Sequence, residues 1–457
     1  MKIPNLNKAE FFYSIFPRVA LKDTLCAFEI RGIGIDKRLL PNEEYIIRVI
    51  PQEENNSAEL LTYSTWLKYD GVTAKTDGDG VLRFNFMLTR EQIYTFRLAK
   101  KKENGEWDIL NNFRVFCAAA DLYERIPVRG NTHCHASPSV DGHEDPYIAA
   151  TLYRKAGFDY LAITDHHLTD GSLIAITENE KLPSDMWLLP GEEVHIPDAY
   201  IHAVNVGAIF DKNGLDKYYH AHREECEKEI RIIADGIKGS LPDGVLPMDY
   251  AYRKWIADKI HEKGGIAILA HPFWEWEAHN TRDDVFRYFA KEKIYDAAEI
   301  LHGQEKGCQD ANMQSAFWND LRAEGIYISP LGVDDAHRRY FNWDYECGFN
   351  EVYTVAFVKE KSLEGLSEAF RGGFTAAVES YENAPEHVIA TYRLTKFTLF
   401  LLQCYFPYHD ELCFTEGYYL KEAYLGDENA VKMLKLLKGQ TESFYNKFFG
   451  KIRKDYL

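Results

Sequence analysis

The stretch IPVRGNTHCH, residues 126–135, is the one from which the fold can be worked out, because a short strand-like run ends there in an H-x-H pair. Residues two apart on a strand point to the same side, so His133 and His135 can reach one metal ion. Similar residues end or lie in later strand-like runs: Asp165, His166 and His167 after DYLAIT; Glu192 and Glu193 after LLPG; His202 within IHAVNVGAIF; His271 after GIAILA; and Asp334, Asp335 and His337 after ISPLGV.

Strand-like and helix-like runs alternate from about residue 125 to 382, which predicts parallel strands joined by crossover helices. Three helix-like stretches stop at Gly157, Gly264 and Gly325, where C′ glycines are expected. Active sites of barrel-like α/β folds lie at the carboxyl ends of their strands. We therefore expect the histidines and carboxylates to converge there.

The predicted cluster holds at least six histidines and three carboxylates, more than one tetrahedral zinc ion requires. Mixed histidine and carboxylate ligands suit Zn²⁺, Mn²⁺ or Fe²⁺. We therefore expect two or three divalent ions. Two ions bridged by a carboxylate can share a hydroxide and assist hydrolysis.

In this order, the motifs HCH, SVDG, TDHH, GEEV, the His202 strand, AHP and DDAH resemble the PHP (polymerase and histidinol phosphatase) family of metal-dependent phosphoesterases. The resemblance covers residues 125 to 382 and implies a distorted seven-stranded β/α barrel with up to three metals. The β-rich region ahead of it and the closing VYTVAFV–helix–RGGFTAA unit also resemble the carbaryl-hydrolase-like branch. That branch extends the chemistry to carbamates and carboxyl esters.

The resemblance also implies a ligand set and the roles of its members. His133, His135, Glu193 and Asp335 would hold one ion, and Glu193 would bridge to a second ion. The second ion would be held by His202 and His271, and the third by Asp141, His166 and His337.

Three neighbouring residues compete for these places. Glu192 competes with Glu193, Asp334 with Asp335, and His143 with Asp141. His167 stands where the family usually has Asp or Asn, so it is predicted to support a ligand or to contact substrate.

Further residues are candidates for contact with the substrate. His302 follows the AAEIL run and could contact substrate or donate a proton, or simply cap a loop. We group it with Glu193 and Asp335 as catalytic candidates. Arg338 or Arg339 could assist, although such pairs are more often surface charges.

The remaining chain predicts two flanking regions. Aromatic and β-branched runs separated by turns indicate a β-sandwich-like domain over residues 1–124. In GVLRFNFML, period two places Leu82, Phe84, Phe86 and Leu88 on one apolar face. The barrel domain is predicted over residues 125–382, and residues 383–457 after it are predicted to form a helical segment. Its phenylalanines are typical of a helical face that packs against other structure. That structure is either the barrel or a second subunit, so a homo-oligomer is one of the two alternatives.

Composition limits the partners. The chain has 457 residues, and 53 basic against 71 acidic residues give a formal charge of −18, which argues against nucleic acid and anionic membranes. The histidines, in contrast, are concentrated in one part of the chain: 14 of 16 lie between His133 and His337, where the metal cluster is predicted. Scattered cysteines and the absence of a signal-like N-terminus predict a cytoplasmic protein.

We therefore expect a hydrolase that attacks a small phosphorylated ester with a metal-bridging hydroxide. Two different functions remain open on the same residues: carboxyl-ester or carbamate hydrolysis, and non-catalytic binding of a metal or ligand. Polymerase-associated proofreading is disfavoured by the length and the negative charge.

Overall fold

The computed structural model describes residues 12–34, 38–53, 65–196, 202–237, 241–275, 279–303, 309–337, 351–381 and 384–451. The chain divides into two compact units. One comprises residues 1–125, 399–409 and 439–457, and the other comprises 126–398 and 410–438. The segment from 383 onward thus contributes to both units.

The first unit contains two β-sheets. A three-stranded antiparallel sheet has the order β1 (Tyr13–Phe16), β3 (Leu25–Gly32) and β6 (Leu82–Met87). A five-stranded sheet has the order β2 (Val19–Leu21), β8 (Trp107–Ala118), β7 (Ile93–Lys101), β4 (Glu44–Pro51) and β5 (Gly71–Lys75). The unit also contains η4 (Thr65–Lys68), α1 (Ala120–Tyr123) and α13 (Gln440–Phe448).

Both sheets contribute to one apolar core, which makes this unit a β-sandwich. The ring centroids of Phe28 on β3 and Phe96 on β7 lie 5.0 Å apart. On β6, Leu82 and Phe84 are buried whereas Arg83 and Asn85 are exposed. The period-two prediction for this strand is therefore confirmed.

The second unit contains a mixed six-stranded sheet. Its order is β11 (Trp187–Leu189), β10 (Tyr160–Ala162), β9 (Ile126–Asn131), β17 (Val352–Val358), β18 (Thr375–Glu379) and β19 (His387–Ile389). The strands β9, β10 and β11 are parallel, whereas β17 runs antiparallel to β9.

A five-stranded sheet completes this unit, with the order β12 (Gly191–Val194), β13 (Ala203–Val206), β14 (Ile266–Leu269), β15 (Ala297–His302) and β16 (Ser329–Val333). The expectation of parallel strands throughout is wrong here, because β13 is antiparallel to both β12 and β14. Only eight residues separate β12 from β13, too few for the crossover that parallel strands need.

The sequence predicted His202 to lie within a strand, but it immediately precedes β13. Since β13 is reversed, its amino end lies at the same edge as the carboxyl ends of β12 and β14. His202 therefore reaches the same edge of the sheet as Glu193 and His271.

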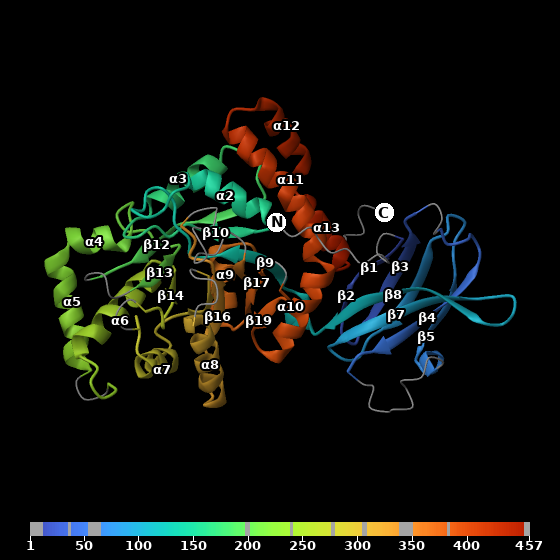
Figure 1. Ribbon diagram of the computed structural model, residues 1–457, viewed down its shortest axis with the longest axis horizontal. Coiled ribbons are helices and arrows are strands. Elements are labelled where there is room, and N and C mark those ends of the chain that lie inside the picture. The colour runs from blue at the N-terminus through green and yellow to red at the C-terminus, as the bar shows by residue number, and fades with distance from the viewer. Residues whose placement is uncertain are drawn as a thin grey trace. The chain divides into compact units, whose positions relative to one another are not determined.

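Helices surround the two sheets, as Figure 1 shows for α4, α5 and α6 beside β12–β14. The helices assigned wholly or mainly to this unit are α2 (Pro146–Lys155), α3 (Asp170–Asn179), α4 (Leu215–Ala221), α5 (Arg223–Gly236), α6 (Pro247–Glu262), α7 (Asp283–Glu292), α8 (Gln309–Ala323), α9 (Leu363–Arg371), α10 (Tyr392–Cys404), α11 (Phe406–Tyr424) and α12 (Glu428–Leu437). The predicted glycines after α2, α6 and α8 all have positive φ, of 95°, 76° and 79°.

Isolated bridges connect the ends of the two sheets. Cys134 after β9 pairs with Ala336 after β16, and His166 after β10 pairs with Glu193 in β12. Apolar side chains from both sheets also share a core that includes Val128, Val204 and Leu331. The unit is thus a mixed α/β structure built on two sheets.

Within the described residues, no helix has the length and apolar character needed to cross a membrane.

Candidate metal centre

Glu193 on β12 lies at the middle of the cluster, and it is surrounded by imidazoles. Its Oε1 is 2.8 Å from His202 Nδ1 and 3.2 Å from His271 Nε2. Its Oε2 is 2.7 Å from His166 Nδ1 and 3.4 Å from His133 Nε2. The two oxygens of one carboxylate therefore face different groups of histidines.

Asp335, after β16, is the second central carboxylate. Its Oδ1 lies 2.9 Å from His135 Nε2 and 3.2 Å from His133 Nε2. Its φ is +46°, and its N–H donates to the carbonyl of His133. The left-handed backbone turns this carboxylate towards the H-x-H pair.

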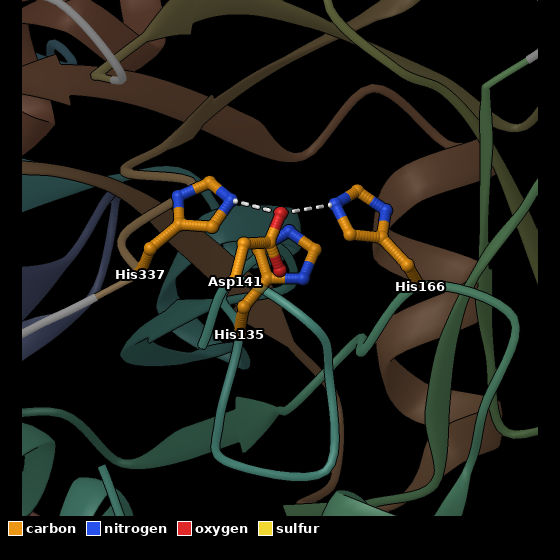
Figure 2. A group of neighbouring side chains, drawn as sticks. All are labelled: His135, Asp141, His166 and His337. Carbon is orange, nitrogen blue, oxygen red and sulfur yellow. Dashed lines mark hydrogen bonds and ion pairs between the residues drawn. The ribbon is translucent and has the colours of Figure 1, made fainter. Parts of the chain in front are cut away.

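Asp141 forms the outer part of the cluster, and Figure 2 shows its carboxylate between the imidazoles of His166 and His337. Asp141 Oδ2 is 2.9 Å from His166 Nε2 and 3.4 Å from His337 Nε2. The ring of His135 stacks on His337 with centroids 4.4 Å apart. Ligand atoms of all four residues lie within 4.8 Å of one another.

The predicted ligands thus fall into adjacent donor groups. They include His135, Asp141, His166 and His337; His133, His135 and Glu193; and Glu193, His202 and His271. All nine predicted metal ligands belong to the cluster, with Asp335 joined through His133 and His135.

The chemistry of these groups fits metal ions. His133 Nε2 is buried and has no hydrogen-bond partner among the described residues, and it faces Glu193 and Asp335. Burial alone would raise the pKa of Glu193 and Asp335, but charged neighbouring histidines lower it well below its usual range. Burial lowers the pKa of His135 to about 4. The pKa of His133 and of His166 is raised instead, because neighbouring carboxylates outweigh burial. Ionised carboxylates and neutral imidazoles are the forms that coordinate metals, so metal binding would release the protons of these two histidines.

The competing acidic residues point elsewhere. Asp334 accepts hydrogen bonds from the hydroxyl of Tyr153 and the side-chain amide of Asn131. Glu192 accepts hydrogen bonds from the backbone N–H groups of Leu215 and Asp216 at the start of α4. Both are buried acids that tie the strand ends to neighbouring structure.

The competing histidines also have surroundings of their own. His167 has a positive φ of 61°, and its half-exposed imidazole lies 3.3 Å from Asp216. The N–H of His143 donates to the carbonyl of His337. Arg338 and Arg339, the predicted basic helpers, lie outside the described residues.

His302 is completely buried at the end of β15. Its Nε2 is 3.0 Å from Asp335 Oδ2, and its Nδ1 faces Asp310 at 3.6 Å. This placement suits the orientation of Asp335 better than direct contact with a substrate.

Two residues of the cluster were missed by the sequence reasoning. Glu299 on β15 accepts a hydrogen bond from His133 Nδ1 at 2.8 Å and another from the N–H of His271 at 2.8 Å. His195 lies 2.9 Å from His166 and 3.5 Å from Glu193. A lone carboxylate inside the apolar run AAEIL, and a histidine two positions after Glu193, were signals for them.

Comparisons with known proteins gave structural matches alone. No family model matches the sequence, and no curated protein matches it. A two-domain protein from Bacteroides vulgatus, described as containing a predicted PHP-like metal-dependent phosphoesterase, is 16% identical, with a TM-score of 0.37. That alignment covers 56% of this chain and 66% of the other, slightly less than two thirds of its length.

Two further solved structures are similar. A candidate metal-dependent phosphoesterase from Bifidobacterium adolescentis is 15% identical, with a TM-score of 0.32, over 48% of this chain and 92% of the other. An amidohydrolase from Chromobacterium violaceum is 17% identical, with a TM-score of 0.30, over 46% and 87%. Two of these three structural neighbours are thus described as metal-dependent phosphoesterases, the first of them as PHP-like.

Proposed function

We propose that this protein is a metal-dependent hydrolase whose preferred substrates are small phosphate esters. The observation that carries the proposal is the position of Glu193, whose two oxygens face separate sets of histidines within one buried cluster. A carboxylate so placed can join two metal ions.

The fold proposed for this centre is a distorted seven-stranded barrel. Its strands would be β9, β10 and β12 to β16, and the bridges Cys134–Ala336 and His166–Glu193 support closure between the sheets. Both bridges lie at the edge that carries the ligands.

The ligands divide into three proposed positions. His133, His135, Glu193 and Asp335 would hold one ion, and Glu193, His202 and His271 a second. Asp141, His166 and His337 would hold a third. Zn²⁺, Mn²⁺ and Fe²⁺ all suit such mixed sets.

When bound, divalent ions supply Lewis acidity and lower the pKa of water towards about 7. Residues of the chain would bind these ions and orient the side chains that bind them. Glu193 and Asp335 are the central carboxylates, and His302 orients Asp335 through its second oxygen. Glu299 fixes the ring of His133 so that Nε2 faces both carboxylates.

Exposure indicates the side from which a substrate arrives. The side chains of His133 and Glu193 are essentially inaccessible, whereas that of Asp141 is 41% exposed. His166 and His337 have intermediate exposure. We therefore place the substrate at the outer group drawn in Figure 2.

Charge supports a phosphate ester as the substrate. In a chain of formal charge −18, bound ions would provide a local positive centre for an anionic ester. We propose a small-molecule substrate and a cytoplasmic reaction, without nucleic acid or membrane partners.

The test uses the metal-reconstituted full chain with phosphomonoesters, phosphodiesters, aryl carboxyl esters and carbamates. Phosphoester hydrolysis that is lost in His133→Ala and Glu193→Ala supports the proposal. The matched controls are His222→Ala and Glu324→Ala, which alter partly exposed side chains in other ion pairs and should retain full activity.

Two other results would each contradict part of the proposal. Turnover of carbon esters alone would assign the site to carboxyl-ester or carbamate hydrolysis. Full metal occupancy without turnover on any substrate would favour a metal- or ligand-binding protein.

A further inference from the structure

His166 has two ring nitrogens that face different neighbours. Its Nε2 faces Asp141 at 2.9 Å, within the four-residue group that also includes His135 and His337. Its Nδ1 faces Glu193 Oε2 at 2.7 Å and His195 Nε2 at 2.9 Å. A neutral imidazole coordinates through one nitrogen and carries a proton on the other.

On its Nδ1 side, His166 belongs to a three-residue donor group with Glu193 and His195, whereas the donor group on its Nε2 side has four members. A metal in the fuller, four-residue group would take Nε2 of His166. The proton of His166 then sits on Nδ1 and needs an acceptor. Glu193 Oε2 also faces His133 Nε2 at 3.4 Å and His135 Nε2 at 3.6 Å, so in the proposed metal-bound form it belongs to that donor group. His195 Nε2 is the other neighbour within hydrogen-bond distance.

His195 is itself held firmly in place. It directly follows β12, on the same side of the chain as Glu193, and its backbone N–H donates to Asp216 Oδ2 at 2.8 Å. The residue is 7% exposed, and its ring lies 4.1 Å from that of His202. A fixed, buried acceptor can select one tautomer of its partner.

We propose that His195 is a positioning residue that accepts a hydrogen bond from Nδ1–H of His166 and so commits Nε2 to the outer metal position. The inference rests on the proposed metal-dependent function and deepens it. It gives His195 a role distinct from the nine ligands, because His195 acts through His166.

Titration of the full chain with Zn²⁺ in competition with a chromophoric chelator measures how many zinc ions bind and how tightly each one binds. His195→Leu removes the acceptor, whereas His195→Gln retains an acceptor oxygen near the position of Nε2. We expect one equivalent of Zn²⁺ to bind ~10–100-fold more weakly in His195→Leu, with near wild-type binding in His195→Gln. His222→Leu is the matched control and should bind as the wild type does.

The tautomer provides a second readout that does not depend on activity. Long-range ¹H–¹⁵N correlation spectra of histidine-labelled, zinc-loaded protein should show the His166 proton on Nδ1. The His195→Leu variant should show a mixture of tautomers or exchange broadening.

The possible results separate the inference from the proposed function. Equal weakening in both His195 variants would make His195 a metal ligand and overturn the inference. Unchanged zinc binding and an unchanged tautomer in His195→Leu would also overturn it. Wild-type protein that binds no zinc would instead remove the proposed function itself.

Discussion

Adjacent acidic residues in this chain have separate tasks. Glu193 and Asp335 face the histidines, whereas Glu192 and Asp334 accept hydrogen bonds from α4 and from Tyr153. The family resemblance favoured Glu193 over Glu192 and Asp335 over Asp334. Beyond the family resemblance, sequence left the choice between Asp334 and Asp335 open, because it depends on the left-handed backbone at Asp335.

Glu299 offers a direct test at the scale of one residue. Its two oxygens accept hydrogen bonds from His133 and from the backbone of His271, and Gln has only one acceptor oxygen to replace them. Glu299→Gln should weaken metal affinity ~10–100-fold in a chelator competition assay. Glu324→Gln, whose carboxylate pairs with Arg287 at the surface, should leave affinity unchanged. Equal affinities in the two variants would refute the positioning role of Glu299.

At the scale of elements, the ends of the strands bring the ligands together. Most of these strands could be predicted from the sequence, because each is an apolar run that ends in histidine or acidic residues. The sequence did not reveal the direction of β13, which follows from the short connection to β12. Local periodicity shows which face of a strand is apolar and does not show the direction in which the strand runs.

Asp296 joins several of these elements. It precedes β15 and accepts hydrogen bonds from His261 on α6, Arg371 on α9 and the N–H of Ala267 on β14. Burial alone would raise the pKa of Asp296, but the bonds from His261 and Arg371 dominate and lower it. The ionised carboxylate therefore stabilises the fold.

The sign of the pH effect follows from the lowered pKa. The contribution is fully present above the unfolded-state pKa of about 4 and is lost as the pH falls through the lower folded-state value. Asp296→Asn should lower the free energy of unfolding by ~1.5–3 kcal/mol at pH 7, measured with urea. The difference from wild type should shrink below pH ~4. A difference that persists unchanged in acid would contradict this account.

At the scale of the whole molecule, sequence patterns separated the β-rich N-terminal region from the α/β region. They did not indicate that residues 399–409 and 439–457 group with the first unit and residues 410–438 with the second. The phenylalanines of this segment are largely buried, as Phe397, Phe400 and Phe448 show. Apolar helical faces predict burial without naming the partner.

Metal removal should change the stability of the molecule. Ions that bind the folded state more tightly than the unfolded state stabilise it by mass action. Chelator-treated protein should therefore melt at a lower temperature in differential scanning fluorimetry, and Zn²⁺ or Mn²⁺ should restore the melting temperature. Treatment with chelator already saturated with metal is the control. An unchanged melting temperature on removal would contradict tight binding at the buried cluster.

The most direct test of the central claim is elemental analysis of the reconstituted full chain beside Glu193→Gln. A carboxylate that joins two ion positions predicts two or three bound ions in the wild type and fewer in Glu193→Gln. Fewer than two ions in the reconstituted wild type, or an unchanged number in Glu193→Gln, would contradict a multinuclear centre organised by Glu193.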